Sequence, residues 1–415
     1  MRHWMRIVLP LACMTVAAFA GQTGAAEYET QTNKTPQDAI PAELTTGPNY
    51  SVKDPVVADG YMYRFTVTST VGSYEVTGIG ALRKLQREIW AIGEMQKVTR
   101  TEAFLKSLKD QAGKPIVFVK DVVTKPIDTL SGIPKGVGRL FSNVSTAVTT
   151  TRKPTQESRT KEALMVGSFK RDYAAKYEVD PYSTNKVLQD ELDKLANASA
   201  LGLWTASIGT MPIGGTAGAV MTATSLSKSF NNVLQVEPPS RIRTINEDKL
   251  KEMGVSASLA KQYLDQPVYT PRQNLLMVDS LYRLGPVTGR DAYLKASMQA
   301  AQEDEANFFV NTAQILRGYH EAQGPITGLT MVENLVVAQT KAGPAVIPFA
   351  LDYGVWTANA DRLSRELKSR YRVPGFNGSF ELWVAGAVSP KARQELEARG
   401  FKVVEQANTR MEIMD

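Results

Sequence analysis

Cysteine and histidine are almost absent from this chain. Of its 415 residues, one is a cysteine and two are histidines. Cys13 and His3 lie in an N-terminal segment with the pattern of an export signal, so the mature chain keeps only His320. This absence excludes disulfides, cysteine nucleophiles and cysteine-based zinc sites, and it leaves every histidine-based mechanism dependent on one residue.

The N-terminal segment predicts export. Two arginines precede an apolar run over residues 7–20, which ends in Ala-Phe-Ala, the small-x-small pattern that signal peptidase accepts. The run is shorter than the roughly 20 residues that span a bilayer. We therefore expect residues 1–26 to be a signal peptide, with cleavage after Ala20 or Ala26 left open.

Export without cysteine favours a bacterial compartment. Exported eukaryotic proteins usually carry disulfides, which the mature chain cannot form. We expect a periplasmic or secreted bacterial protein, either free or associated with the membrane. With 43% hydrophobic and 22% charged residues, the composition is that of a globular protein, and the length predicts two or three domains.

Basic residues are concentrated in one part of the chain. The net charge is +6, and residues 81–171 hold 18 Lys and Arg against 8 Asp and Glu. Such an asymmetry indicates a surface for anionic lipid, lipopolysaccharide or polyanionic glycan, although solvated helix faces give the same pattern. Nucleic acid is not expected as a partner of an exported protein.

Within this basic part, residues 115–149 have the pattern of amphipathic helices broken by proline and glycine. Lys120, Lys125, Lys135 and Arg139 fall largely on the faces opposite the apolar stripes. This arrangement suits interfacial helices on anionic lipid, and it also suits ordinary helices packed on a neighbouring domain. We predict these four residues as the surface-binding residues.

The N-terminal part of the mature chain predicts a leader and a hairpin. Residues 27–55 are polar and rich in Thr, Pro, Gly and Asn, which favours a flexible leader. Residues 61–68 and 73–77 alternate aromatic or branched with polar residues across a short turn, so we expect an antiparallel hairpin. Helical spacing follows over residues 82–95 and 102–111.

The middle of the chain predicts helices. Apolar spacing indicates helices over residues 161–176 and 185–198. Residues 196–227 carry no charge, and whether they are buried, mobile or inserted in a membrane is left open. A proline pair at 238–239 indicates a boundary near residue 240.

Beyond that boundary, four helices are expected, followed by a change of pattern. The helices cover residues 256–264, a segment starting at Thr270-Pro271, and residues 290–301 and 303–319. After residue 325 short apolar runs alternate with helices. Residues 380–388 and 401–405 predict two strands joined by a helix over 390–399, which favours a parallel pair.

We therefore predict a mainly helical, multi-domain α+β protein. It has an N-terminal β-hairpin with helices, a helical middle, and a small C-terminal α/β domain. The first expected unit, residues 56–150, holds the hairpin and the basic helices. A helical segment over residues 161–240 and a helical block over residues 241–324 follow. The α/β domain covers residues 325–415.

The sequence contains no complete catalytic motif among those considered. We expect His320 at a helix end, where histidine commonly caps carbonyls. A zinc-protease motif fails because Gly324 replaces the second histidine. Ser-x-x-Lys occurs at Ser183 and Ser225, but no Lys-Thr-Gly accompanies it, and such short patterns arise by chance. We expect no cofactor and no metal.

Binding is therefore expected rather than catalysis. The leading interpretation is an exported envelope protein that binds an anionic lipid, lipopolysaccharide or glycan surface through its basic amphipathic region. One alternative is an envelope glycan hydrolase that uses two carboxylates in a cleft between the helical and α/β parts. The other is a scaffold or assembly subunit with an envelope protein as its partner.

Overall fold

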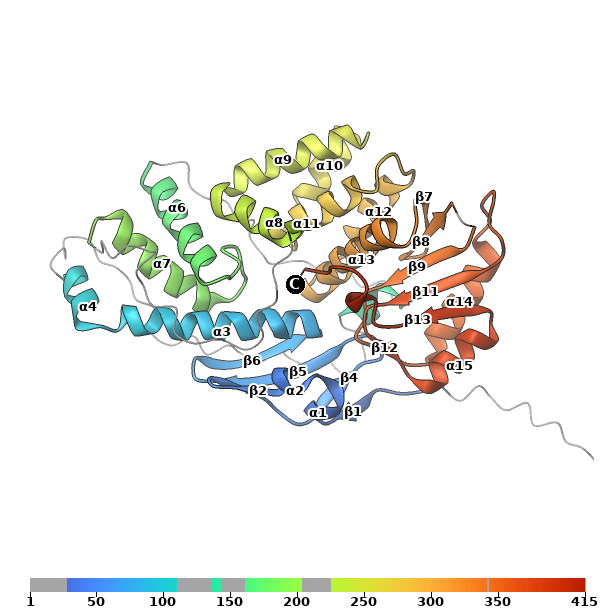
Figure 1. Ribbon diagram of the computed structural model, residues 1–415, viewed down its shortest axis with the longest axis horizontal. Coiled ribbons are helices and arrows are strands. Elements are labelled where there is room, and N and C mark those ends of the chain that lie inside the picture. The colour runs from blue at the N-terminus through green and yellow to red at the C-terminus, as the bar shows by residue number, and fades with distance from the viewer. Residues whose placement is uncertain (1–27, 110–135, 143–160, 204–224, 342, 415) are drawn as a thin grey trace, which may run out of the picture.

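The computed structural model describes residues 28–109, 136–142, 161–203, 225–341 and 343–414. Figure 1 shows a sheet formed by the N-terminal part, a group of helices from the middle, and a second sheet formed by the C-terminal part. The predicted mixed α+β class with mainly helical content is confirmed. The predicted signal peptide and most of residues 115–149 lie outside the described residues.

The N-terminal sheet is antiparallel and is built around β5 (Tyr63–Ser69). β6 (Gly72–Thr77) pairs with β5 from Arg64 opposite Thr77 to Ser69 opposite Gly72, so the predicted hairpin is confirmed. Aromatic and branched side chains of β5 alternate toward the core, as a half-buried strand requires. The other strands of this sheet are β1 (Thr32–Lys34), β2 (Thr46–Gly47), β3 (Tyr50–Val52) and β4 (Val56–Ala58).

Three of these strands lie where the sequence predicted a flexible leader. β1 pairs with β4, and β3 pairs with both β2 and β5. Tyr50 and Val52 are buried, as are Ile40, which follows α1 (Pro36–Ala39), and Leu44 in α2 (Ala42–Thr45). A few apolar residues at the right spacing therefore anchor a segment whose average composition is polar, because each contributes its burial separately.

Helix α3 (Ile79–Thr99) lies across this sheet, as Figure 1 shows. Its buried face includes Leu82, Leu85, Ile89, Ile92 and Met95, so the predicted helical stripe is confirmed. The far end of α3 packs on a helix pair that was also predicted from spacing. This pair is α6 (Lys161–Lys176) and α7 (Lys186–Ala200), and α4 (Glu102–Lys109) follows α3 in the chain.

The helices α8 to α13 pack together, and we use the name helical block for them from here on. The first two, α8 and α9, were not predicted as helices. α9 begins at Pro239, where a boundary was expected, because proline is well tolerated in the first turn of a helix. The predicted capping signals at Ser256 and at Thr270-Pro271 are confirmed, and Thr270 forms a complete capping box with Gln273. The helices are α8 (Ser225–Val236), α9 (Pro239–Glu252), α10 (Ala257–Leu264), α11 (Pro271–Tyr282), α12 (Arg290–Ser297) and α13 (Glu303–Ala322).

The C-terminal sheet has the order β13-β11-β9-β8-β7. β11 lies between β9 and β13 and is parallel to both, so the predicted parallel pair is confirmed. β7 and β8 form an antiparallel hairpin beside β9, and β7 was not predicted. The strands are β7 (Ile326–Val332), β8 (Leu335–Thr340), β9 (Ala345–Phe349), β11 (Phe380–Val384) and β13 (Phe401–Val404).

Two helices connect the parallel strands and lie on the same outer side of the sheet in Figure 1. α14 (Ala358–Arg370) connects β9 to β11, and α15 (Pro390–Ala398) connects β11 to β13. Near the start of these helices, β10 (Tyr353–Gly354) pairs in parallel with β12 (Ala387–Val388). Helix α13 contacts β7 and β9, so the sheet is covered by helices from more than one part of the chain.

One apolar core cluster extends through both the helical block and the C-terminal sheet. It also includes Val137, Leu140 and Phe141 from the short described segment around α5 (Val137–Leu140). Two smaller clusters lie beneath the N-terminal sheet and among α3, α6 and α7. Among the described helices, none is both long enough and apolar enough to cross a membrane.

Candidate functional site

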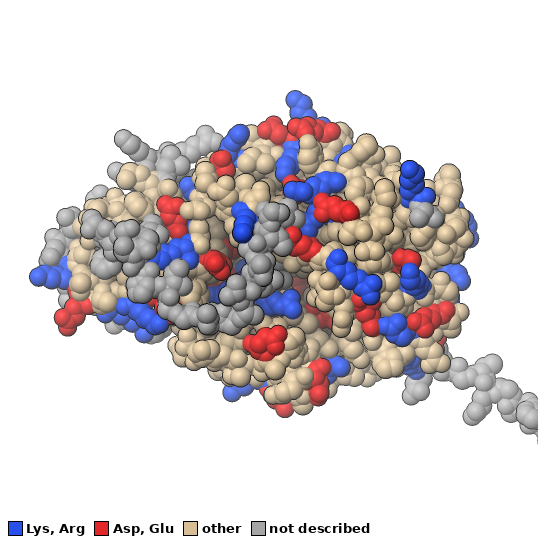
Figure 2. All heavy atoms as spheres, viewed as in Figure 1, with Lys and Arg blue, Asp and Glu red and all other residues tan. Residues whose placement is uncertain are grey.

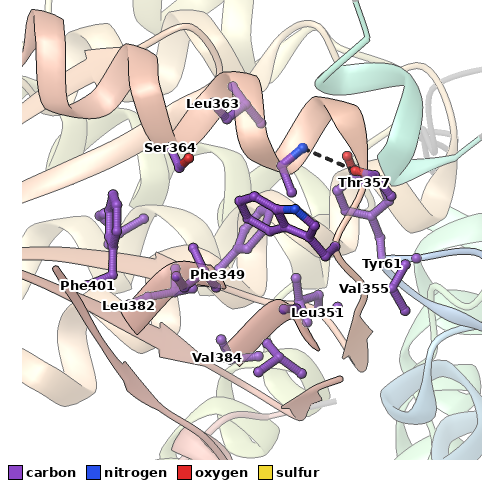
Figure 3. Close-up of a pocket in the computed structure, with 18 of the residues that line it drawn as sticks. Tyr61, Phe349, Leu351, Val355, Thr357, Leu363, Ser364, Leu382, Val384 and Phe401 are labelled. Carbon is purple, nitrogen blue, oxygen red and sulfur yellow. Dashed lines mark hydrogen bonds between the residues drawn. The ribbon is translucent and has the colours of Figure 1, made fainter. Parts of the chain in front are cut away.

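An apolar cavity of about 80 Å³ lies between the C-terminal sheet and the helices α14 and α15. Figure 3 shows its lining, with Phe349, Leu382, Val384 and Phe401 rising from the strands and Leu363 on the helical side. Among the lining residues, all of which the structure describes, none carries a charged side chain. The cavity is therefore suited to an apolar group.

The spacing of apolar residues explains why these elements line the cavity. In α14 the lining residues are Ala360, Leu363, Ser364 and Leu367, which share one helix face because they follow the 3.6-residue period. In α15 they are four residues apart, at Ala392 and Leu396. The small side chains among them leave space that a leucine at the same position would fill.

Most polar groups in the lining are occupied by hydrogen bonds within the protein. The Ser364 hydroxyl donates to the Asp361 carbonyl (2.7 Å), and the Thr357 hydroxyl accepts the amide of Ala360 (3.1 Å) as the cap of α14. The Tyr61 hydroxyl accepts the Asn359 side-chain amide (2.9 Å), and burial raises the pKa of this tyrosine. These groups contribute to the wall rather than offering reactive atoms.

Trp356 is the exception. Its side chain is fully buried and lines the cavity, and its indole Nε1 has no hydrogen-bond partner among the described residues. The Arg399 guanidinium lies 4.5 Å from the centre of the indole ring, a cation–π contact. A buried indole N–H without a partner is uncommon in folded proteins.

The rim outside Trp356 carries a charged cluster on α14. The buried Asp361 carboxylate pairs with Arg365 (2.8 Å) and Arg399 (3.0 Å) and accepts the Tyr28 hydroxyl (2.9 Å). This hydrogen bond is the main reason that the pKa of Tyr28 is raised. The cluster fixes the outer wall of the cavity, because each of its cations is held by a carboxylate.

The four predicted surface-binding residues are not brought together within the described structure. Lys120, Lys125 and Lys135 lie outside the described residues. Arg139 faces inward, which differs from its prediction as a surface residue. Its guanidinium bonds both oxygens of the fully buried Glu305 carboxylate (2.7 and 2.6 Å) and the Gln299 carbonyl (2.7 Å).

The physical reason for the inward position is the neighbourhood of α5. Val137 and Leu140 are buried on either side of Arg139, and the first turn of α13 supplies the carboxylate opposite it. An amphipathic pattern identifies a polar face but does not say whether water or a carboxylate meets that face. On the face shown in Figure 2, the described Lys and Arg side chains are interspersed with Asp and Glu.

Histidine and serine–lysine chemistry find no support in the described geometry. His320 stands in the last turn of α13, where its Nδ1 accepts the Ile326 amide (3.1 Å), a contact that differs from the expected capping of helix carbonyls. Lys186 pairs with Asp190 (2.7 Å), while the Ser183 hydroxyl donates to Glu88. This Ser-x-x-Lys pattern therefore does not bring its two groups together.

Acidic residues near the start of α13 make structural contacts. Glu303 pairs with Lys84 (3.3 Å) and accepts the Thr184 hydroxyl (2.7 Å), which connects α13 to α3. Burial raises the pKa of Asp304 to about 6. None of these carboxylates lines the apolar cavity, so they do not supply it with an acid or a base.

Comparisons with protein-family models, with curated proteins and with solved structures gave no match. Within the described residues, no group of three or more His, Cys, Asp or Glu side chains is placed to hold a metal ion. Function must therefore be argued from the cavity. The sequence signals that could have located it are the Thr357 cap and the apolar face of α14, whereas the Trp356 environment has no local signal.

Proposed function

We propose that this protein is a non-catalytic, exported binding protein whose C-terminal cavity receives the apolar end of an amphiphilic ligand. The observation that carries this proposal is the cavity lining, whose wall is apolar and carries no charged side chain. Catalysis would need a positioned acid, base or nucleophile, and the lining polar groups other than the indole are already bonded. We therefore assign the cavity a role in binding rather than in catalysis.

The size of the cavity restricts the ligand class. At about 80 Å³ it is smaller than the roughly 150 Å³ of an engineered apolar cavity that binds benzene. A whole drug-sized molecule would not fit, since typical ligand pockets exceed roughly 300 Å³. The end of an acyl or isoprenoid chain fits, with its polar part left outside.

Calorimetric titration with linear carboxylates from butyrate to dodecanoate tests this proposal. We expect the affinity to rise by up to about fourfold per methylene until the cavity is full, and to level off beyond that length, because each buried methylene contributes about 0.8 kcal/mol. A negative heat-capacity change of binding should accompany the rise. Absence of binding, or affinity that is independent of chain length, would overturn the proposal.

A cavity-filling variant provides the control. Ala392 lines the cavity and is 3% exposed, so Ala392→Leu should occupy its space and weaken binding at least tenfold. The matched substitution Ala257→Leu places the same side chain at an exposed position of α10 and should leave the affinity unchanged. Equal affinity of wild type and Ala392→Leu would place the ligand elsewhere.

For the anionic part of such a ligand, or for an anionic surface, we propose Lys120, Lys125 and Lys135. The basic excess of residues 81–171 supports this assignment, and Arg139 is left out because it is paired with Glu305. Reversing the three lysines to glutamate should abolish pelleting with anionic liposomes. A control with the same change of net charge reverses the exposed Lys53, Lys251 and Lys341, and equal pelleting by both variants would refute the assignment.

A further inference from the structure

The first described residues of the chain lie against the C-terminal region, more than three hundred positions away. We call residues 28–34 the strap. The Glu29 amide donates to the Trp356 carbonyl (2.7 Å), and the Trp356 amide donates to the Glu29 carboxylate (2.6 Å). The same carboxylate oxygen accepts the Ser389 hydroxyl (2.5 Å). One side chain of the strap therefore holds two separate loops.

Those two loops lead into the helices that cover the cavity. Trp356 immediately precedes Thr357, the cap of α14, and Ser389 is the cap of α15. The Glu29 carboxylate also lies at the start of α15, where the helix dipole favours negative charge. Charge-assisted hydrogen bonds of this kind are roughly twice as strong as neutral ones.

The strap is fixed at both ends. At its start, Tyr28 donates to Asp361 of α14. At its end, β1 pairs with β4, and the Lys34 ammonium lies 4.1 Å from the centre of the Tyr353 ring beside the same loop. No residue of the strap lines the cavity, so any effect of Glu29 on a ligand must act through the parts it holds.

We propose that Glu29 is a positioning residue that clamps the roof of the cavity and thereby sets the rate of ligand exchange. This inference rests on the proposed function, because it concerns the same cavity. The clamp holds the Trp356 peptide and the start of α15 in both the empty and the filled protein. Its loss therefore raises how often these two loops move away from the cavity, while the cavity in its clamped form and its affinity stay nearly the same.

Hydrogen exchange and ligand kinetics together test the clamp in the full-length mature protein. In Glu29→Ala we expect the Trp356 amide to exchange at least tenfold faster, because it loses its acceptor. Stopped-flow mixing with decanoate should show association and dissociation both at least tenfold faster, with the dissociation constant changed less than threefold. Glu29→Gln keeps one acceptor oxygen, so its exchange and ligand rates should lie between those of the wild type and Glu29→Ala. It replaces the alanine variant in these measurements if that variant does not fold.

Glu247→Ala on α9 is the matched control, since it removes an exposed glutamate that also takes part in an ion pair. It should change none of these rates. Unchanged exchange of the Trp356 amide in both Glu29 variants overturns the clamp, and so does faster amide exchange with unchanged decanoate kinetics. Failure of the wild type to bind decanoate, together with faster amide exchange in Glu29→Ala, overturns the proposed function but supports clamping of the loops.

Discussion

Arg139 shows how the neighbourhood of a single residue decides its role. In sequence it is one of several basic residues in a basic segment, and in the structure its side chain is only 13% exposed. Its bidentate contact with Glu305 joins α5 to the first turn of α13. The two partners lie 166 positions apart, so no local pattern could have paired them.

Removing Arg139 should destabilise the protein strongly. In Arg139→Ala the fully buried Glu305 carboxylate loses its cationic partner and keeps only the Ala301 amide as a donor among the described residues, so we expect the free energy of unfolding to fall by about 3–5 kcal/mol. Urea denaturation followed by circular dichroism measures this loss. The double variant Arg139→Met/Glu305→Leu removes both charges and should recover most of it, whereas a loss below about 1 kcal/mol in Arg139→Ala would show that the pair is not structurally important.

At the scale of elements, the start of α3 depends on a carboxylate from another part of the chain. The Asp352 side chain accepts the amides of Ile79 (3.1 Å) and Tyr63 (3.0 Å), so it connects the loop after β9 to both α3 and β5. Burial raises the pKa of Asp352 to about 7, and these two amides oppose the rise. The carboxyl group therefore titrates near neutral pH in the folded protein.

This pKa predicts a pH-dependent stability. Between pH 4 and pH 7 the folded state binds more protons than the unfolded state, whose aspartate has its ordinary pKa near 3.8, so stability falls as pH rises. The contribution of Asp352 to the free energy of unfolding should fall by at most about 1.4 kcal/mol per pH unit across this window. Urea midpoints measured from pH 4.5 to 7.5 test the direction.

Asp352→Asn should flatten this dependence without removing it. Burial also raises the pKa of Asp304 and of Glu88, so both contribute a change of the same sign. Asp248→Asn, at an exposed position of α9, is the matched control for the loss of one carboxylate. A stability that increases from pH 4.5 to 7.5 in the wild type would contradict the prediction.

Elements with strong local signals could be predicted from the sequence. The helix and the last strand of the β11, α15 and β13 unit have a serine cap, proline in the first turn and a glycine stop, and both lie where expected. The first strand was expected over residues 380–388, but β11 ends at Val384 and residues 387–388 form β12, which pairs with β10. The strands of the expected leader could not be predicted, because β1 and β3 are only three residues long and depend on pairing with β4 and β5. Short strands are specified by their partners more than by their own residues.

Some parts of the cavity could likewise be predicted from local sequence, whereas others depend on residues far away in the chain. The helical face of α14 follows from spacing, since its lining residues repeat with the helical period. The space opposite that face depends on β9 and β11, and the position of Trp356 depends on Glu29. A site assembled from segments hundreds of residues apart leaves no contiguous motif, so binding could be expected from the sequence but not located.

At the scale of the whole molecule, the helical block and the C-terminal sheet share one core. Phe308 of α13 connects them, because its ring lies 5.4 Å from that of Phe141 and 5.6 Å from that of Phe349 in β9. Phe309 continues the contacts to Tyr293 of α12. A continuous set of packed rings thus extends from α12 to the sheet, which favours cooperative unfolding of the two parts.

Phe308→Ala tests whether these two parts unfold together. The side chain is 2% exposed, and its loss should lower the free energy of unfolding by about 3–5 kcal/mol. Trp356 and Trp383 report on the C-terminal part once Trp4, Trp90 and Trp204 are replaced by phenylalanine, while far-ultraviolet circular dichroism reports mainly on the helices. We expect both midpoints in urea to fall by the same amount.

The comparison decides between one cooperative unit and two independent ones. If the helical block were independent of the sheet, Phe308→Ala would lower the circular dichroism midpoint and leave the tryptophan midpoint nearly unchanged. Leu105 on α4 is 43% exposed, so Leu105→Ala should change the free energy of unfolding reported by either probe by no more than about 0.5 kcal/mol. Coincident shifts would mean that a ligand held against the sheet stabilises α13 and its neighbours as well, because binding free energy is distributed over the whole cooperative unit.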